Sequence, residues 1–315
     1  MNELTRYLAE EIALDQTDGL IARREALRRL LLLGLSATAA ETLLSSCTPT
    51  SPASPAGAAP QSSAVSSAAA SAGSVAAPAG STGKPASGAL EPVEITFAGR
   101  LRGSWAAPEQ PRGGVLILHE NRGLTAHFQA LPGRFAAAGY GALAVDLLSA
   151  EGGTASLGES ANATAALSKA PPERLVTDMK ASLDELARRV PGRKLGAVGF
   201  CFGGAMTWRL LGARDPRLSA AAPFYGPLPE GADFTGSRAA VLAVYAGRDA
   251  RVNATRDAAR AALEKSGAPH EIITFEEADH AFFNDDRPEV HDATASAVAW
   301  ERTIDFLHRR LDGPF

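Results

Sequence analysis

The sequence predicts an α/β fold, in which helices cover both faces of a doubly wound, mostly parallel β-sheet. From residue 91 onward, short β-rich runs alternate with longer helical patterns, as they do in such sheets. The run Gly114–Leu118 has no polar alternation, which is typical of a strand covered on both faces. About 225 residues follow residue 90, enough for one domain with a sizeable core.

The expected strands and helices follow one another in alternation along this part of the chain. The strands are Val93–Phe97, Val115–Leu118, Ala142–Asp146, Leu195–Phe200, Ala220–Phe224, Val241–Ala246 and Glu271–Phe275. The helices cover about residues 127–138, 172–190, 202–212, 252–267 and 292–311. Because ligands of these sheets bind beyond the carboxyl ends of the strands, we expect the functional residues in the loops that follow the strands.

Composition excludes one class of partner and separates the two cysteines. The formal net charge of −4 argues against a nucleic-acid partner, which usually requires a basic patch. Cys47 ends an apolar run before a low-complexity stretch, whereas Cys201 lies in a glycine-rich segment. A disulfide would tie that stretch to a turn of the folded domain, so we expect each cysteine to have its own chemistry.

Residues 1–47 have the pattern of an export signal. Arg23 and Arg24, with further arginines, precede the apolar run Leu30–Ala40. A basic stretch before such a short apolar stretch is typical of a secretory signal, and the run is too short to span a membrane. Because paired arginines indicate the twin-arginine route, which exports folded proteins, we expect this protein on the periplasmic side of a bacterial cell envelope.

The end of this signal segment resembles a bacterial lipobox. In Leu44–Cys47 the cysteine would become the lipid-anchored first residue of the mature protein, which would attach it to a membrane. The alternative is a cytoplasmic protein with an amphipathic N-terminal helix. Glu41 interrupts the apolar end, and the leader carries the carboxylates Glu3, Glu10, Glu11, Asp15 and Asp18.

Residues 48–90 predict a disordered linker. They are almost entirely Ser, Ala, Pro, Gly and Thr, and Lys84 is the one charged residue. A stretch of this kind cannot bury enough apolar surface to offset its ordering entropy. We therefore expect a tether between the signal segment and a catalytic domain at 91–315.

The segment Gly199–Gly203 has the form Gly-x-nucleophile-x-Gly, with Cys201 at its centre. It follows an apolar strand and precedes a helix, which is the context of the nucleophile elbow of an α/β-hydrolase. The N-terminus of the following helix would favour a thiolate, and the Phe202 N–H would be an oxyanion donor. The alternative is a buried cysteine in a glycine-rich packing turn.

The other members of a catalytic triad follow in the chain order of this fold, nucleophile, acid and histidine. Asp249 lies in the loop beyond one expected strand, and His280 lies in the loop beyond the next. Histidine held by a carboxylate can accept the thiol proton. Asp279 or Glu277 could serve as the acid instead, but residues so close to His280 rarely reach its far ring nitrogen.

The segment 119–123 leaves the strand Val115–Leu118 at the same edge of the expected sheet. Glu120 would lie near Cys201 and contribute proton chemistry, or it could be a solvated loop carboxylate. The Asn121 N–H would be the second oxyanion donor. Arg122 could bind an acidic substrate group or be a surface charge, and His119 could line the pocket.

Together these residues resemble the dienelactone hydrolase (carboxymethylenebutenolidase) family over roughly residues 91–313. The shared motifs are His119-Glu120-Asn121-Arg122-Gly123-Leu124, Gly199-Phe200-Cys201-Phe202-Gly203-Gly204, Phe224-Tyr225-Gly226, Asp249 and His280-Ala281-Phe282-Phe283-Asn284-Asp285. The resemblance implies a Cys201-His280-Asp249 triad and a Glu120 that interacts with the cysteine and helps to generate the thiolate when substrate binds. Tyr225 and Phe282 are further substrate-binding candidates. The arginines that hold a dienelactone carboxylate in this family have no counterpart in residues 147–154 or 281–284, although Arg287 lies slightly further on.

The predicted activity is hydrolysis of a small ester or lactone through a thioester on Cys201. Backbone N–H groups of Phe202 and Asn121 would hold the oxyanion, and His280 would move the protons. The chemistry requires no cofactor, and the sequence shows no cluster of metal ligands. The alternative is a non-catalytic binding module anchored at the cell surface, because fold alone does not imply catalysis.

Overall fold

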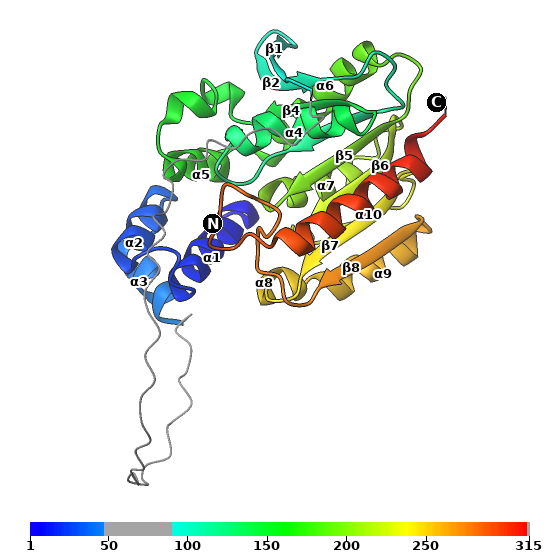
Figure 1. The fold of residues 1–315 in the computed structure, drawn as a ribbon. Coiled ribbons are helices and arrows are strands. Elements are labelled where there is room, and N and C mark those ends of the chain that lie inside the picture. The colour runs from blue at the N-terminus through cyan, green and yellow to red at the C-terminus, as the bar shows by residue number, and fades with distance from the viewer. Residues whose placement is uncertain (47–89, 314–315) are drawn as a thin grey trace, which may run out of the picture.

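The computed structural model describes residues 1–46 and 90–313. Cys47 and nearly all of the predicted linker lie outside these residues. Figure 1 shows one large α/β domain, with a group of helices from the N-terminus against one end of it.

The domain is built on one eight-stranded sheet with the order β1-β2-β4-β3-β5-β6-β7-β8. β1 (Val93–Phe97) pairs antiparallel with β2 (Leu101–Ala106), and β2 pairs antiparallel with β4, whereas the remaining pairs are parallel. The parallel strands are β3 (Gly114–Leu118), β4 (Gly141–Asp146), β5 (Leu195–Phe200), β6 (Leu218–Phe224), β7 (Ala240–Ala246) and β8 (His270–Phe275). Every residue of β3, β4, β5 and β7 is buried, as the unbroken apolar runs predict.

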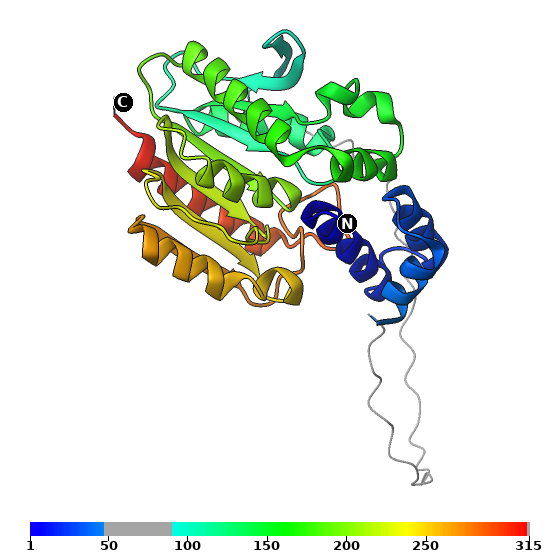
Figure 2. The same cartoon turned by 180° about the vertical axis from the view of Figure 1, so that it is seen from behind.

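Helices cover both faces of this sheet, so the predicted fold class is confirmed (Figures 1 and 2). α4 (Ala126–Ala137) and α10 (Ala293–Leu311) pack on one face, and α6 (Pro172–Arg189) and α7 (Phe202–Gly212) pack on the other. The shorter elements are the 3₁₀ turns Ser149–Glu151 and Thr154–Leu157 and the helices α5 (Ser160–Lys169), α8 (Ala250–Asn253) and α9 (Arg256–Ser266).

Three elements differ from the prediction. β2 was not expected, because Arg102 and Gly103 interrupt its apolar pattern. It is an antiparallel strand whose Arg102 side chain is exposed. α5 lies in a loop that the sequence did not position. The helix expected at 252–267 is divided into α8 and α9, because Asp249 caps a separate helical turn that begins earlier.

The N-terminal segment forms three helices, α1 (Glu3–Thr17), α2 (Arg23–Leu32) and α3 (Ala37–Ser46). The apolar run Leu30–Ala40 is divided between α2 and α3, and its buried residues join the hydrophobic core. No described helix is both long and apolar enough to cross a bilayer. The function of this segment as an export signal stays a prediction.

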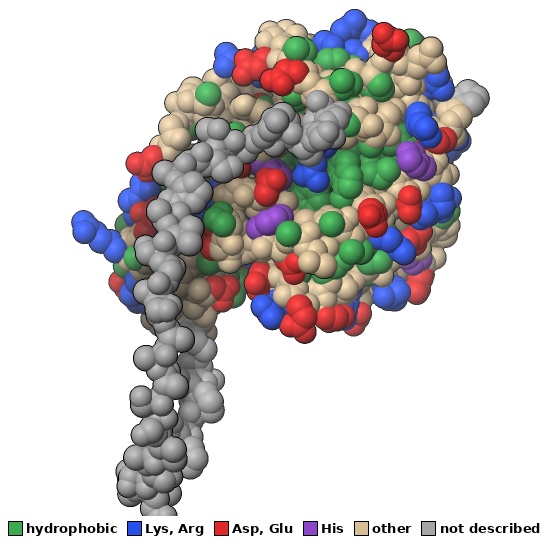
Figure 3. Space-filling view, in the orientation of Figure 1, with side chains coloured by type: hydrophobic (Ala, Val, Ile, Leu, Met, Phe, Trp, Pro, Cys, Tyr) green, Lys and Arg blue, Asp and Glu red, His purple; other side chains and the backbone are tan. Residues whose placement is uncertain are grey.

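Side chains of both charge signs are interspersed on the face that Figure 3 shows. Many exposed charged side chains of the domain form ion pairs, such as Arg302 with Glu271 at 3.2 Å. Such pairs contribute little to stability, but they leave little uncompensated charge. This visible face therefore offers no large basic patch of the kind that nucleic-acid binding requires.

Candidate active site

Cys201 lies in a strained turn between β5 and α7. Its backbone has φ 54° and ψ −116°, a conformation that residues with a side chain rarely adopt. The turn is tight because its glycines touch neighbouring backbone. A Cβ on Gly199 would lie 2.1 Å from the Gly203 carbonyl oxygen, and a Cβ on Gly203 would lie 2.2 Å from the Leu118 carbonyl oxygen. This is the geometry of a nucleophile elbow.

Asp249 and His280 meet at the carboxyl edge of the sheet, beyond β7 and β8. Nδ1 of His280 and Oδ2 of Asp249 form a hydrogen bond. The other oxygen of Asp249 accepts a hydrogen bond from the Val252 N–H at 3.0 Å, which holds the carboxylate in place. The competing acids Asp279 and Glu277 both face Arg248 on the surface.

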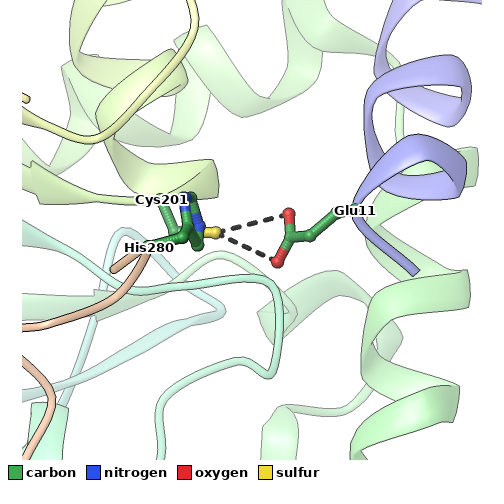
Figure 4. Close-up of side chains that lie close together, drawn as sticks. All are labelled: Glu11, Cys201 and His280. Atoms are coloured by element: carbon green, nitrogen blue, oxygen red, sulfur yellow. Dashed lines mark hydrogen bonds between the residues drawn. The ribbon is translucent and has the colours of Figure 1, made fainter. Parts of the chain in front are cut away.

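Nε2 of His280 faces Cys201, but the thiol donates elsewhere. Nε2 has no hydrogen-bond partner among the described residues, although it lies within 4.8 Å of Sγ of Cys201. Sγ instead lies 3.4 and 3.5 Å from the two carboxylate oxygens of Glu11, which reaches in from α1 (Figure 4). The Tyr7 hydroxyl, also on α1, lies 3.3 Å from Sγ.

The pKa values of the three groups reflect this environment. Burial raises the pKa of the Cys201 thiol, and the Glu11 charge adds to this, while His280 opposes it. Burial alone would lower the pKa of His280, but the Asp249 carboxylate and Cys201 raise it well above its usual range. Burial likewise opposes ionisation of Asp249, yet His280 holds the pKa of that carboxyl below its usual range.

Glu120 is buried near the triad, and its hydrogen-bond partners in the structure are groups other than the thiol. Its carboxylate accepts a hydrogen bond from Nδ2 of Asn284 at 2.9 Å and lies 3.5 Å from the Tyr225 hydroxyl. Glu11 contacts Cys201 instead. This contact could not be predicted from the sequence, because Glu11 lies in the predicted leader.

The two predicted oxyanion donors lie on either side of the turn. Phe202 is the first residue of α7, and the first N–H groups of a helix have no partner within it. Asn121 is buried, and its carbonyl oxygen accepts a hydrogen bond from the Thr164 hydroxyl. Its side-chain amide donates to Oε1 of Glu11 at 2.7 Å, so Glu11 also occupies the polar groups beside the thiol.

His119 has a structural position and not the pocket-lining position that the sequence suggested. Its side chain is fully buried, and both ring nitrogens contact backbone groups, at 2.7 Å from the Glu120 oxygen and 3.1 Å from the Leu147 nitrogen. Burial lowers its pKa, which keeps the ring neutral. The half-buried Arg122 forms no hydrogen bond or ion pair with the described residues. Burial raises the pKa of Asp15, and the charge of Arg122 offsets a small part of this rise.

Tyr225 and Phe282 support the histidine loop. The Tyr225 ring packs edge-on against His280 at 5.2 Å between centroids and against Phe282 at 5.5 Å. Both aromatic side chains are fully buried. These contacts hold the His280 ring in place, so the structure gives the pair a positioning contact and not an open substrate contact.

Two arginines that the sequence did not assign to the site lie beside the triad. Arg251, on α8, has its guanidinium 4.4 Å from the centre of the Tyr7 ring and 3.9 Å from Glu11, and two of its buried nitrogens have no partner among the described residues. Arg287 is buried and lies 3.8 Å from Asp15. Both line a cavity of about 390 Å³ together with His280 and Asp249. The one sequence feature that could have assigned these two arginines to the site is that each lies close to a loop at the end of a strand.

Glu11, Cys201 and His280 are the one group among residues 1–46 and 90–313 that could hold a metal ion. Each offers one donor atom, and the three atoms lie within 4.8 Å of one another. Sulfur, imidazole nitrogen and carboxylate oxygen are the ligands that Zn²⁺ takes. A metal there would block the thiol, so this grouping would inhibit a cysteine hydrolase and not assist it.

Comparisons with known proteins agree with this geometry. The sequence model of the dienelactone hydrolase family matches residues 101–311. A Yersinia pestis protein named "Putative carboxymethylenebutenolidase" is 32% identical over 223 residues, which cover 64% of this chain and 81% of that protein. The crystal structure of a "Putative Dienelactone Hydrolase" from Klebsiella pneumoniae, 28% identical, superposes with a TM-score of 0.60 and covers 69% of this chain and 97% of its own.

The dienelactone hydrolase-like phosphotriesterase P91 from metagenomic libraries is 26% identical, with a TM-score of 0.56, and it covers 70% of this chain and 97% of its own. The family match spans the strand-end loops that carry Cys201, Asp249 and His280. It does not include α1, α2 or α3. The chain therefore belongs to the dienelactone hydrolase family and has the α/β-hydrolase fold.

Proposed function

We propose that this protein hydrolyses an ester or lactone bond with Cys201 as nucleophile, His280 as base and Asp249 as the group that orients His280. The observation that carries the proposal is the strained Cys201 elbow, which stands beside a His280 already paired with Asp249. Backbone strain of this kind costs free energy and is concentrated at functional sites. A strained Cys201 next to an unpartnered Nε2 therefore favours a catalytic role over that of a structural turn.

The proposed reaction has two stages. The Cys201 thiol gives its proton to His280, and the thiolate attacks the substrate carbonyl carbon. The Phe202 and Asn121 N–H groups stabilise the resulting oxyanion, by about 3–4 kcal/mol for each donor. His280 then protonates the leaving alkoxide, which leaves an acyl thioester. Water, deprotonated by His280, hydrolyses the thioester and restores the thiol.

Arg251 and Arg287 favour a substrate that carries an anionic group next to the reacting carbonyl. Guanidinium groups bind carboxylates through charge-assisted hydrogen bonds, and two nitrogens of Arg251 are unpartnered within the described part of the chain. In this sequence these residues take the place of the arginines that the family resemblance led us to expect in residues 147–154 and 281–284.

Trapping the acyl-enzyme tests this proposal. The test uses Glu11→Lys, which removes the carboxylate that contacts Sγ of Cys201. In this background an activated ester should add its acyl group to the peptide that contains Cys201, and mass spectrometry would locate it. Cys201→Ala should abolish both acylation and hydrolysis, while Cys47→Ser, the matched change at the other cysteine, should leave both unchanged. Hydrolysis that survives in Cys201→Ala would contradict the assignment of Cys201 as the nucleophile.

Export and lipid attachment at Cys47 remain proposals from the sequence. They are supported by Arg23 and Arg24 before a short apolar run and by the lipobox-like Leu44–Cys47. Cell fractionation and incorporation of labelled fatty acid would test them, with Cys47→Ser as the variant that should lose the label. A soluble cytoplasmic protein without label would contradict them.

A further inference from the structure

We propose that α1 is a built-in inhibitor, which excludes substrate from Cys201 until the N-terminal segment is displaced or removed. The proposal rests on the assignment of Cys201 as the nucleophile. Glu3, Tyr7, Glu11 and Asp15 recur at every fourth position of α1 and so lie along one side of the helix. We call these four residues the α1 stripe.

The two ends of the α1 stripe are held by ion pairs with the catalytic domain. Oε2 of Glu3 accepts a hydrogen bond from Arg209 at 2.5 Å, and its other oxygen accepts one from the Glu230 N–H at 2.9 Å. At the other end Asp15 lies 3.8 Å from Arg287. Negative charges of α1 thus meet positive charges of the domain at both ends, which fixes the helix in one register.

The middle of the α1 stripe occupies the catalytic groups themselves. Glu11 accepts hydrogen bonds from Sγ of Cys201 and from the side-chain amide of Asn121, and it lies 3.9 Å from Arg251. Tyr7 contacts Sγ as well and packs beneath the Arg251 guanidinium. Figure 4 shows the Glu11 carboxylate pointing from α1 directly at the thiol.

These contacts leave no room for a substrate carbonyl at Sγ, because the cavity of about 390 Å³ beside the triad is lined by Glu11, Asp249 and His280 but not by Cys201. Cys201 is only 2% exposed, and Glu11 is 5% exposed. An attacked carbonyl carbon must reach van der Waals contact with Sγ, in the volume that the Glu11 carboxylate and the Tyr7 hydroxyl now fill. Burial of a carboxylate is costly unless it is paired, and the groups that pair with Glu11 all belong to the active site. The helix is therefore fitted to this cleft and does not merely cover it.

The α1 stripe also explains carboxylates that are unusual in an export leader. Glu3, Glu11 and Asp15 are three of the acidic residues that weaken that interpretation of residues 1–47, and each faces a group of the cleft. If the segment is cut before Cys47, as its lipobox-like end predicts, α1 loses its covalent link to the domain. Activation would then follow processing, because a detached helix must compete with substrate.

The rate at which iodoacetamide alkylates Cys201 tests the inhibitor directly and does not depend on catalysis. The full-length chain is used, and only the peptide that contains Cys201 is quantified by mass spectrometry, so that Cys47 does not contribute. Glu11→Lys places a cation beside Arg251 and should displace α1, which raises the alkylation rate at least about tenfold. Glu10→Lys is the matched control, because Glu10 forms no hydrogen bond or ion pair with the described residues, and it should react at the wild-type rate.

A second form of the protein covers the case in which Glu11→Lys does not fold. A site-specific protease sequence placed within residues 48–90 allows the folded chain to be cut, and the N-terminal segment can then be removed in high salt. The cut protein should be alkylated as fast as Glu11→Lys and should gain esterase activity by a similar factor.

Equal alkylation rates for the wild type, both variants and the cut protein would overturn the inhibitor. Rapid alkylation of Glu11→Lys without any ester hydrolysis would support the inhibitor but count against the proposed function. Slow alkylation of the wild type, with both alkylation and hydrolysis faster in Glu11→Lys and the cut protein, would support both proposals.

Discussion

His280 and Asp249 are joined through Nδ1 of the imidazole, and this hydrogen bond decides which nitrogen faces Cys201. Because Nδ1 is engaged, Nε2 is the atom left to accept the thiol proton. The pairing also favours the charged imidazolium once the proton has moved. The contact therefore sets both the tautomer and the basicity of the proposed base.

Replacement of Asp249 should remove this orientation. In the Glu11→Lys background, which exposes the thiol, Asp249→Asn should lower kcat on an activated ester by roughly 10³- to 10⁴-fold, because the amide favours the wrong tautomer. Asp279→Asn is the matched control, since Asp279 lies near Arg248 on the surface. A loss of activity no larger than that of the control would remove Asp249 from the triad.

The elbow should not tolerate a methyl group at Gly203. Gly203→Ala would place a Cβ 2.2 Å from the Leu118 carbonyl oxygen, so we expect a loss of about 1–3 kcal/mol in the free energy of unfolding. Gly212→Ala, in the same helix, meets its nearest atom at 3.8 Å and should be neutral or stabilising by about 0.5–1 kcal/mol. Urea unfolding measures both values, and equal values would show that the elbow can relax.

Arg251 should select for charge on the substrate. In the Glu11→Lys background, Arg251→Gln should raise KM about tenfold for an ester that carries a carboxylate, and leave KM for a neutral ester of the same shape unchanged. Arg248→Gln is the control, because Arg248 is exposed and pairs with Glu277. If both esters respond equally to Arg251→Gln, the residue acts on the fold and not on substrate charge.

Docking of α1 should weaken as pH rises. Burial raises the pKa of Asp15 and of the Cys201 thiol, so both groups favour the docked form while they are protonated. Each of these groups stabilises the docked form fully at a pH below the pKa that the group has in the undocked protein. This stabilisation is lost as the pH rises through the higher pKa that the group has when α1 is docked. Burial raises the pKa of Tyr7 as well, so it acts in the same direction.

The alkylation rate of Cys201 reports this dependence. The ratio of the Glu11→Lys rate to the wild-type rate cancels the intrinsic reactivity of iodoacetamide and much of the effect of thiol ionisation. We expect the ratio to fall from mildly acidic to alkaline pH. A ratio that increases with pH would mean that groups other than Asp15, Tyr7 and Cys201 control docking.

Local sequence determined the elbow and most of the sheet. The unbroken apolar run of β3 indicates a buried strand without reference to any distant residue, and Gly199 is required by its close approach to the Gly203 carbonyl oxygen within the same turn. β2 was missed because its apolar pattern is interrupted at Arg102 and Gly103, and its pairing with β4 depends on residues more than one element away.

The sequence alone determined the fold class, the nucleophile candidate and the order of the residues around it, because these follow from local spacing and chain order. Only the tertiary structure decided the partners of those residues. It placed His119 in the interior, moved Glu120 away from the thiol and brought Glu11 to Cys201 across 190 residues of sequence. The physical reason is that the periodicity of a helix shows which side will be buried but contains no information about what buries it.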